Sequence, residues 1–386
     1  MAKKTIEQID ICGLSLSAVI EKVNAVFGKN TLALASSAKG LTIRKLSTGV
    51  YALDFCLGGG VPENRITELF GKYSALKSTI CNRVIANFQK RYPKGQAFYE
   101  DGEQSFDPTY AEHCGVDCDR LGIINSDCGE QAIDVISALI RNNVHVLVII
   151  DSIASLIPLD ELECSAEQQF QGLHPRLIGK LMRILSKGMK RNMYDATAAT
   201  TTVIATNQLR EKTGIVYGNP EFTPGGRAKD HYCSVRIKFT SNKSDSLMEK
   251  VVHHGIERER RVGQVVNFEI NKNKVGHSQF EEGTFTYFIR AYKDHAPYTI
   301  DNEEILFRYG VYYGLILRLV GKKKPVYCFD GMQYAEPAFK NRLITSVKQF
   351  KLFRMIMREM LEEDSAGLVS SADDTERKPV KIVFNK

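Results

Sequence analysis

The distribution of apolar residues predicts alternating strands and helices from about Leu46 to about Tyr292. The run VHVLVIID at 144–151 is nearly all apolar, which is typical of a strand buried on both faces of a parallel sheet. Further strands are expected at 65–70, 95–100, 200–208, 234–240, 264–272 and 284–292. Helices are expected from near Leu76, at about 130–141 and at about 175–191. The pattern therefore predicts an α/β fold with a mostly parallel central sheet.

The two ends of the chain depart from this alternation. Residues 15–27 have helical spacing and precede a short polar stretch, and this N-terminal helix packs either on its own domain or on a neighbouring subunit. The alternation is also interrupted inside the chain, where a charged insert occupies 241–261 between two expected strands. From about residue 304 the composition becomes that of a small basic domain, expected to be α+β, and the last residues, from about Asp364, are expected to be flexible. The expected divisions are 1–46, 47–300, 301–363 and 364–386.

The basic domain is expected to carry a helix at about 338–362. Its buried face is predicted to contain Leu343, Val347, Phe350 and Met357. Its basic residues are Lys340, Arg342, Lys348, Lys351, Arg354 and Arg358, and they follow Lys322, Lys323 and Lys324. Such a helix either forms a solvated face or attracts duplex DNA through its phosphates.

Composition narrows the possible classes of protein. The 386 residues are 43% hydrophobic and 25% charged, with no apolar run long enough to span a membrane and no secretory signal. Nine scattered cysteines are typical of free thiols in a reducing compartment, although His113, Cys114, Cys118 and Cys128 leave a zinc site open. The expected location is the cytoplasm. The formal net charge of +7 is compatible with a polyanionic partner.

The stretch LFGKYSALKST resembles a phosphate-binding loop. The usual pattern is G-x-x-x-x-G-K-[ST]; Gly71, Lys77 and Ser78 have the right spacing, but Leu76 replaces the second glycine. The match lies between an expected strand and helix, where backbone N–H groups can surround phosphate oxygens. Lysine supplies charge to the phosphates and the Ser/Thr hydroxyl binds Mg²⁺. The candidate nucleotide-binding residues are Gly71, Lys72, Tyr73, Ser74, Ala75, Leu76, Lys77, Ser78 and Thr79.

Polar residues at other strand ends strengthen the prediction of an ATP site. Asp151 ends a buried strand, where its carboxylate can reach the Mg²⁺ shell. Glu103 lies just past another strand and can orient or activate the water that attacks the γ-phosphate. Asn207 and Gln208 end a third strand, immediately before the long glycine-rich segment 209–230, so that an amide there can contact the γ-phosphate and move the loop with it.

Taken together, several long stretches, which occur in the same order along the chain, resemble the RecA family of recombinases, including the UvsX-like recombinases of T-even-type phages. These stretches are STGVYALDFCLGGGVPENRITELFG, EQSFDPTYAEHCGVD, GEQAIDVISALI, VLVIIDSIASLIP, TNQLREKTGIVYGNPEFTPGGRA and NKNKVG, within about 47–292. The bulky apolar residue at Leu76 is similar to UvsX-like proteins and points toward a phage origin. The resemblance implies a RecA-like ATPase core that uses ATP and Mg²⁺.

The resemblance also implies individual roles. Lys77 and Ser78 are expected to hold phosphates and Mg²⁺, Asp151 to support the metal through water, Glu103 to activate water and Gln208 to sense the γ-phosphate. Asp107 and Tyr110 are expected to bind adenine, although both could simply shape a turn. Two lysines, Lys272 and Lys274, are expected to reach the phosphates of a neighbouring subunit.

Two loops are expected to contact DNA. The first is about 163–174, followed by Arg176, and the second is about 209–228, with Arg210, Gly225, Gly226 and Arg227. Glycines let backbone N–H groups approach phosphates closely. The side chains that either insert between bases or remain partly buried are Phe170, Ile215 and Tyr217.

Some positions depart from the family pattern. Asp230 replaces a family lysine, although Lys229 is adjacent, and Thr213 stands where a bulky inserting residue is expected. These departures leave the subunit contacts and the DNA contacts at these positions open.

The implied function is that of an ATP-dependent DNA recombinase, a DNA-dependent ATPase that forms helical filaments on single-stranded DNA. It would pair that strand with homologous double-stranded DNA and catalyse strand exchange in recombination, repair and recombination-dependent replication. A single-strand-binding protein and a loading mediator are further candidate partners. Two alternatives are a ring-shaped helicase or motor of the same superfamily and a filament-forming mediator in which Leu76 has abolished hydrolysis.

Overall fold

The structure is a computed structural model. It describes residues 11–29, 31–141, 144–164, 172–189, 192–211, 221–241, 243–253, 256–276, 281–319, 326–329, 331–335 and 346–370. The chain forms two compact units, Met1–Ile300 and Asp301–Lys386, and each is described by itself.

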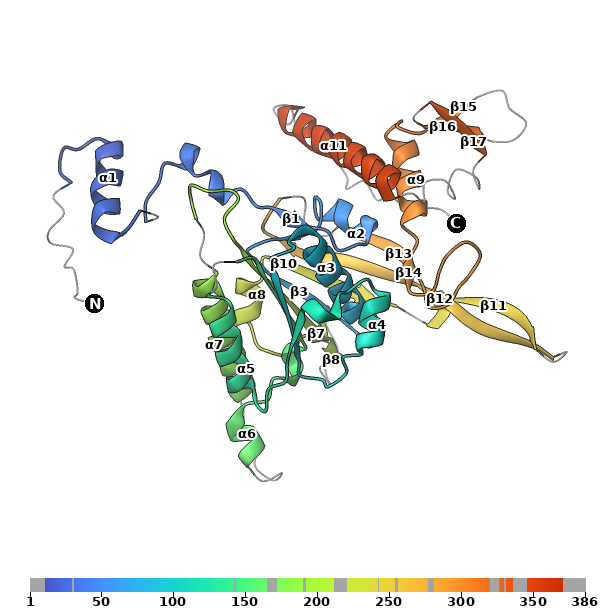
Figure 1. Ribbon diagram of the computed structural model, residues 1–386, viewed down its shortest axis with the longest axis horizontal. Helices are drawn as coiled ribbons and strands as arrows, with labels where there is room; N and C mark the ends of the chain where they lie inside the picture. The colour runs from blue at the N-terminus through green and yellow to red at the C-terminus, as the bar shows by residue number, and fades with distance from the viewer. Residues whose placement is uncertain are drawn as a thin grey trace. The chain divides into compact units, whose positions relative to one another are not determined.

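A ten-stranded sheet organises the described part of the first unit (Figure 1). Its parallel part contains β3 (Ile66–Gly71), β4 (Gln96–Asp101), β5 (Leu121–Ile124), β6 (Val146–Asp151), β7 (Thr201–Gln208) and β10 (Val235–Thr240). Its antiparallel part contains β11 (Ser246–His253), β12 (Ile256–Asn273), β13 (Glu282–Phe288) and β14 (Thr299–Ile300). The spatial order is β14-β13-β12-β10-β3-β7-β6-β4-β5, with β11 beside β12. The predicted α/β fold with a mostly parallel sheet is confirmed.

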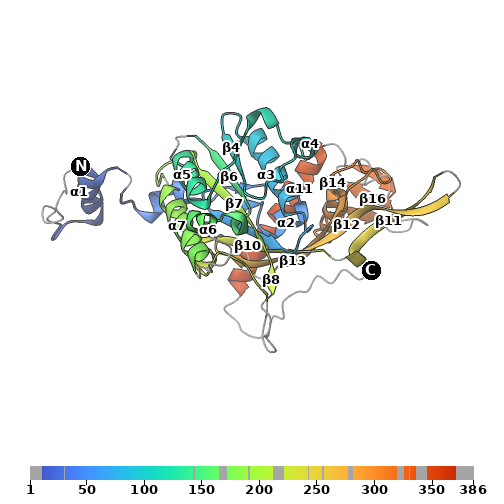
Figure 2. The same ribbon diagram turned by 90° about the horizontal axis from the view of Figure 1, so that it is seen from below.

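Helices cover both faces of the parallel strands. The helices α5 (Gly129–Leu139) and α7 (Leu173–Gly188) lie on one side, and α3 (Lys77–Arg91) lies on the other (Figure 2). Val146, Val148 and Ile150 belong to the same core cluster as residues of α5 and α7. Because side chains alternate along a strand, Leu147 and Ile149 face the side of α3. All five are fully buried, as their uninterrupted apolar run predicts.

Short elements connect this framework. The helices are α1 (Leu16–Phe27), α2 (Tyr51–Cys56), α4 (Pro108–His113), α6 (Leu159–Glu163) and α8 (Ala228–Tyr232). The 3-10 turns are η2 (Ala35–Ser37), η3 (Lys39–Leu41), η4 (Cys118–Arg120), η5 (Ile153–Ser155) and η6 (Lys243–Asp245). The two-residue strands outside the ten-stranded sheet are β1 (Lys45–Leu46), β2 (Val61–Pro62), β8 (Arg210–Glu211) and β9 (Glu221–Phe222). The predicted N-terminal helix is confirmed as α1, which has no buried residue.

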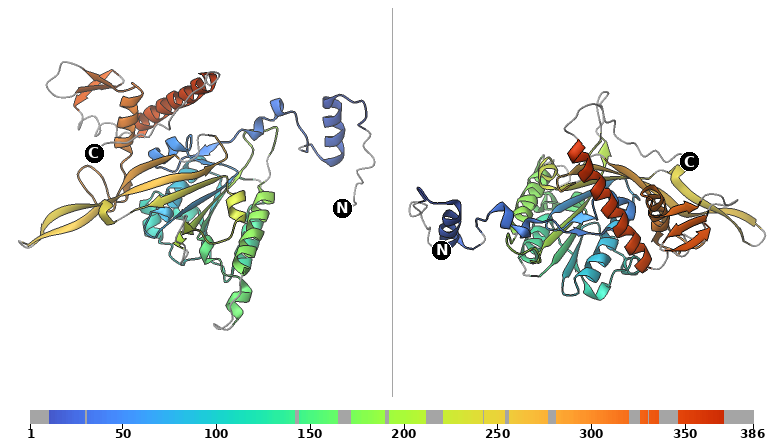
Figure 3. Two further views of the ribbon diagram at one scale, coloured as in Figure 1. Left: turned by 180° about the vertical axis from the view of Figure 1, so that it is seen from behind. Right: turned by 90° about the horizontal axis from the view of Figure 1, so that it is seen from above.

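The charged insert is a β-hairpin rather than an irregular loop. Strand β11 pairs with a β12 that begins at Ile256, whereas the sequence predicts a strand from residue 264. Cross-strand ion pairs join Arg260 to Glu249 and Lys250 to Glu257, each at 2.8 Å. Figure 3 shows the hairpin extending beyond the rest of the sheet. Because the paired segments carry many charged residues and no apolar alternation, hydrophobic periodicity gave no signal.

The second unit is a small α+β arrangement of α9 (Asn302–Tyr312), β15 (Leu317–Leu319), β16 (Val326–Phe329), β17 (Met332–Ala335) and α11 (Ser346–Ser370). The buried face of α11 contains Leu352, Phe353 and Ile356. The predicted buried face was wrong at Phe350, which is 56% exposed, and Met357 is only partly buried.

Helix α11 also ends later than the sequence predicts. It runs to Ser370, past the expected start of a flexible tail at 364. The predicted residues Lys322, Lys323, Lys324, Lys340, Arg342 and Leu343 lie outside the described residues, as does the chain from 371. No helix in the described part of either unit is long and apolar enough to cross a membrane.

A buried ion network lies beneath the end of β7. The Glu68 carboxylate is fully buried, and its oxygens lie 2.5 Å from Arg236 Nε and 3.4 Å from Lys229 Nζ. Lys229 is itself only 1% exposed, and its Nζ lies 2.9 Å from Oδ1 of Asp230. Asn207 donates a further hydrogen bond of 2.8 Å to Glu68. The Lys229 ammonium is therefore bound by two carboxylates of its own chain.

We expect Lys229→Ala to destabilise the first unit by about 3 kcal/mol, because it removes one partner of a buried carboxylate. The matched change Lys238→Ala removes a partly exposed pair with Glu221 and should cost less than about 1 kcal/mol. Since the chain contains no tryptophan, urea unfolding is best followed by far-ultraviolet circular dichroism. Equal losses for the two variants would contradict the buried role of Lys229.

Candidate nucleotide-binding site

A cavity of about 260 Å³ lies at the carboxyl ends of the parallel strands. Its lining residues are Tyr73, Ser74, Ala75, Leu76, Lys77, Ser78, Thr79, Glu103, Asp151 and Gln208. They come from the loop after β3 and the start of α3, from the turn after β4 and from the ends of β6 and β7. The structure thus brings together four groups of residues that the sequence analysis selected separately.

The loop after β3 begins at a glycine and ends at a left-handed leucine. At Gly71 a Cβ atom would lie 2.1 Å from the Phe239 carbonyl oxygen, so the close approach of β10 requires glycine. Leu76 adopts the left-handed conformation, with φ of 61°, and is followed directly by α3. This conformation costs an ordinary L-residue about 1–2 kcal/mol.

Leu76 lies just before the helix that the sequence predicts to start near it. As a member of the apolar i+4 stripe of that helix, its side chain could point into the sheet. It is instead only partly buried and lines the cavity, and the buried stripe begins at Ile80. The reason is that Leu76 precedes the helix in a left-handed turn, so helical periodicity does not extend to it.

Lys77 is placed to bind an anion. Its Nζ donates to the carbonyl oxygens of Gly71 and Lys72, at 3.3 and 3.0 Å. Burial lowers the pKa of this ammonium, while the carboxylates of Asp151 and Glu103 act in the opposite direction. An ammonium held by loop carbonyls can exchange these bonds for phosphate oxygens.

Asp151 and Ser78 form the best candidate Mg²⁺ site. Ser78 Oγ donates to Asp151 Oδ2 at 2.7 Å, and the carboxylate is almost fully buried. A hydroxyl and a carboxylate are oxygen ligands of the kind that Mg²⁺ prefers, so these residues fit the ion. Two further hydroxyls, of Tyr99 and Thr206, also donate to Asp151. Sequence reasoning missed both, because they occupy positions in β4 and β7 that look like ordinary strand residues.

Glu103 and Gln208 meet across the cavity. Gln208 Nε2 donates to Glu103 Oε1 at 3.2 Å. Glu103 lies in a tight turn that Asp101 stabilises by accepting hydrogen bonds from the backbone N–H groups of Ser105 and Phe106, each at 3.0 Å. An exposed carboxylate on such a fixed turn is a candidate general base.

Asp107 and Tyr110 have structural contacts and do not line the cavity. Asp107 caps α4 by accepting from the backbone N–H of Tyr110 at 3.2 Å, which is the turn-shaping alternative. The Tyr110 hydroxyl lies 2.6 Å from Thr79 Oγ1, and its ring meets Tyr298 edge-on at 5.5 Å. Nothing in the sequence predicts this ring contact, because a lone tyrosine between strands carries no motif.

The stems of the two candidate DNA loops pack against each other. Gly225 and Gly226 are both left-handed. A Cβ at Gly225 would lie 3.2 Å from side-chain atoms of Ile153 and Ile178, and one at Gly226 would lie 3.0 Å from Pro175. The glycine pair is therefore needed for this close packing as well as for any contact with DNA.

The cationic residues that flank these loops are exposed. They are Arg176 on α7, Arg210 in β8 and Arg227 before α8. The predicted residues Phe170, Thr213, Ile215 and Tyr217 lie outside the described residues. The stem of the second loop is the β8–β9 pair.

Lys272 and Lys274 do not line the cavity of their own chain. The ammonium of each lies 3.3 Å from the carbonyl oxygen of His231, and Lys272 also donates to the carbonyl of Asp230. In this structure both ammonium groups are therefore bound by carbonyl oxygens of α8.

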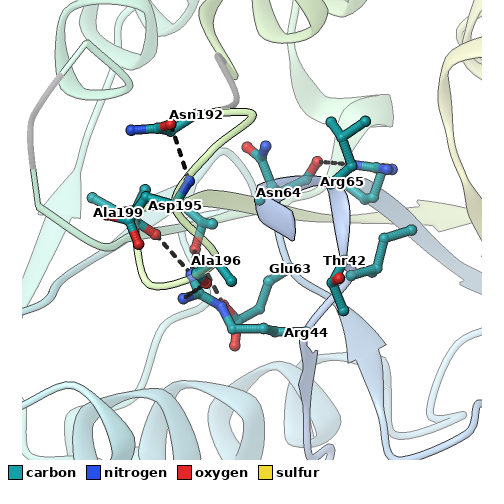
Figure 4. Close-up of a pocket in the computed structure, with 14 residues that line it drawn as sticks. Thr42, Arg44, Glu63, Asn64, Arg65, Asn192, Asp195, Ala196 and Ala199 are labelled. Carbon is teal, nitrogen blue, oxygen red and sulfur yellow. Dashed lines mark hydrogen bonds and ion pairs between the residues drawn. The ribbon is translucent and has the colours of Figure 1, made fainter. Parts of the chain in front are cut away.

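A second pocket lies at the opposite ends of β3 and β7, where these strands begin (Figure 4). Arg44 fills much of it, donating to Glu63 at 3.0 Å and to the carbonyl oxygens of Ala196 and Ala198 at 2.8 and 2.9 Å. These bonds attach the segment after α1 to the core. The polar lining of this pocket is therefore explained by the contacts that Arg44 makes with the core.

Comparison with known proteins identifies the family. The model of the RecA N-terminal domain matches residues 14–288. The chain belongs to the RecA family. It is similar to protein RecA of Mycoplasmopsis pulmonis, with 31% identity over 92% of this chain and 95% of that protein. It is also similar to protein RecA of Rubrobacter xylanophilus, with 38% identity over 70% of this chain and 73% of that protein. The phage relationship stays a prediction.

The left-handed Leu76 gives a test specific to this RecA-family chain. We expect Leu76→Gly to change the free energy of unfolding by no more than about 1 kcal/mol, because relieved strain offsets the extra freedom of the unfolded chain. Leu76→Val should weaken nucleotide binding and stability, because a β-branched residue fits the left-handed region poorly. Urea unfolding and titration with a fluorescent ATP analogue measure the two effects. Tighter binding by the valine variant would contradict this assignment.

Proposed function

We propose that this RecA-family chain, an ATP-dependent DNA recombinase, binds ATP and Mg²⁺ in the cavity beside Leu76 and polymerises into helical filaments on single-stranded DNA. The filament pairs that strand with a homologous duplex and exchanges strands. The observation that carries the proposal is the meeting of Lys77, Ser78, Asp151, Glu103 and Gln208 at one edge of the sheet. Family membership supports the DNA-dependent ATPase activity.

The site residues have separable roles in hydrolysis. Lys77 and the backbone N–H groups after Gly71 hold the phosphates, and Ser78 with Asp151 holds Mg²⁺, which neutralises charge on the phosphate oxygens when bound. Glu103 orients the attacking water and accepts its proton. The Gln208 amide, which contacts Glu103, turns to the γ-phosphate and links hydrolysis to the loop that follows β7.

The filament completes the site. Lys272 and Lys274 lie away from the cavity of their own chain, so they serve the phosphates bound by the next subunit. ATP then lies between protomers, and its binding and hydrolysis control the assembly. The exposed helix α1 is the element best suited to bind the neighbouring subunit, since it has no buried residue in its own chain.

DNA is held through its backbone. Arg176, Arg210 and Arg227 surround the stems of the two loops and attract phosphates. Base pairing between the DNA strands supplies the sequence recognition. Binding should therefore weaken steeply as salt rises, through counterion release.

A joint-molecule assay tests the function directly. Single-stranded DNA is mixed with ATP, Mg²⁺ and either a homologous or a heterologous duplex, and the paired product is measured. We expect product with the homologous duplex only. Electron microscopy of the same mixture should show helical filaments; closed rings without joint molecules would instead support a helicase or motor.

We expect Glu103→Gln to retain ATP binding and to lower the DNA-stimulated hydrolysis rate by about 100-fold or more, since the amide cannot accept the proton. Phosphate release and titration with a fluorescent ATP analogue separate the two effects. Glu112→Gln on the exposed face of α4 is the matched control. Normal turnover in Glu103→Gln would exclude this residue as the base.

Mixed filaments test the contribution of the neighbouring subunit. Lys77→Ala should abolish nucleotide-dependent assembly, and the double change Lys272→Ala with Lys274→Ala should abolish hydrolysis. Co-assembly of the two inactive proteins should restore hydrolysis, because some cavities then pair an intact Lys77 with intact lysines from the next subunit. Absence of restored hydrolysis in a mixture shown to co-assemble would place the two lysines outside the neighbouring site.

A further inference from the structure

The Asp151 carboxylate accepts three hydroxyl hydrogen bonds. Ser78 Oγ donates to Oδ2 at 2.7 Å, the Tyr99 hydroxyl donates to Oδ2 at 2.5 Å, and Thr206 Oγ1 donates to Oδ1. Ser78 lies in the cavity, whereas Tyr99 and Thr206 do not line it. Two of the three donors therefore approach Asp151 from within the protein.

These two donors come from the strands on either side of Asp151. Strand β6 lies between β4, which carries Tyr99, and β7, which carries Thr206. Asp151 is 3% exposed, Tyr99 is 2% exposed and Thr206 is fully buried. The Tyr99 ring also packs against Phe106, with ring centroids 4.9 Å apart. The sheet therefore holds both hydroxyls in place before any ligand binds.

The sheet itself does not require these hydroxyls. Phenylalanine and valine would fill nearly the same volumes at positions 99 and 206, and they would leave no buried polar atom of their own. What the hydroxyls add is a fixed donor for each oxygen of Asp151, which stops the carboxylate from rotating. Hydrogen bonds of this kind to a metal-binding carboxylate set its orientation and strengthen metal binding.

We propose that Tyr99 and Thr206 are positioning residues that fix the Asp151 carboxylate for Mg²⁺ coordination. This inference rests on the proposed function, because it assigns Mg²⁺ to the cavity. The Tyr99 hydroxyl holds Oδ2 and the Thr206 hydroxyl holds Oδ1. The carboxylate is thereby kept turned toward Ser78, the other candidate Mg²⁺ ligand. Neither residue lines the cavity.

The test compares nucleotide binding with and without the metal. The variants are Tyr99→Phe and Thr206→Val, and a fluorescent ATP analogue is titrated in excess chelator and at increasing Mg²⁺. We expect the Mg²⁺ concentration for half-maximal enhancement of binding to rise about 10-fold in each variant, in the range for loss of a supporting hydrogen bond. Binding in chelator should be unchanged. Thr206→Ser keeps a hydroxyl and should restore the Mg²⁺ response.

Matched controls lie in the same protein. Thr202→Val removes another buried threonine hydroxyl from β7, one that accepts from the backbone N–H of Asn64 at 3.3 Å. Tyr92→Phe removes another tyrosine hydroxyl that donates to a carboxylate, that of Glu63, at 2.7 Å. The Thr202 hydroxyl lies near the start of β7, and Tyr92 directly follows the last residue of α3. Both controls should therefore keep the wild-type Mg²⁺ response.

Two results would overturn the inference while leaving the proposed function intact. One is a wild-type Mg²⁺ response in both Tyr99→Phe and Thr206→Val. The other is an equal loss of affinity in chelator and in Mg²⁺, which would indicate a packing role only. A wild-type protein whose nucleotide binding does not respond to Mg²⁺ would overturn the proposed metal site, and this inference with it.

Discussion

The parallel pairing of β3, β7, β6 and β4 is the constraint on which the rest of the structure depends. Parallel strands end at one edge of a sheet, so residues separated by more than a hundred positions in sequence become neighbours there. Lys77 follows β3, Glu103 follows β4, and Asp151 and Gln208 end β6 and β7. The helices that cover both faces bury the strands and leave this edge open. The cavity is therefore a consequence of the topology, and its chemistry depends on the residues at the strand ends.

Within that arrangement the loop after β3 tolerates a leucine where glycine is usual. Leu76 is left-handed and unsupported by a side-chain cap, and Ser74 has a positive φ of 57° as well. Tertiary contacts hold this backbone. The buried Gln264 of β12 donates through Nε2 to the Ser74 carbonyl at 3.2 Å, and Ala75 is fully buried. A strained turn persists when its surroundings fix it in this way, and the antiparallel strands contribute one of the bonds that do so.

The sequence allowed the parallel core and the cavity residues to be predicted, because both depend on local signals. Continuous apolar runs mark buried strands, and a polar residue directly after such a run marks the open edge. The failures have a common cause, which is that the deciding partner is distant in sequence. Tyr99 and Thr206 became informative only once β6 lay between their strands. Lys229 was noted only as the neighbour of Asp230, and its buried pair with Glu68 could not be predicted before the fold placed the two together.

The same reason explains the errors outside the core. The hairpin β11–β12 has charge pairs across its two strands and no apolar alternation, so hydrophobic periodicity does not predict it. Helix α11 was predicted correctly as an element, but its buried face was assigned to Phe350 rather than to Leu352 and Ile356. On a helix with apolar residues on more than one side, the packed face is chosen by the neighbouring elements of its unit.

The end of β7 connects the cavity to the stems of the two candidate DNA loops. Adjacent residues of a strand point to opposite sides, so Gln208 faces the cavity and contacts Glu103 while Asn207 faces the other way. Asn207 Nδ2 donates to Glu68 and to the carbonyl of Pro224, at 2.8 and 3.0 Å. Pro224 immediately precedes the glycine pair that packs on the stem of the first loop. A shift of this strand end toward the phosphates would therefore be felt at both loop stems, because one short piece of backbone carries the contacts to each.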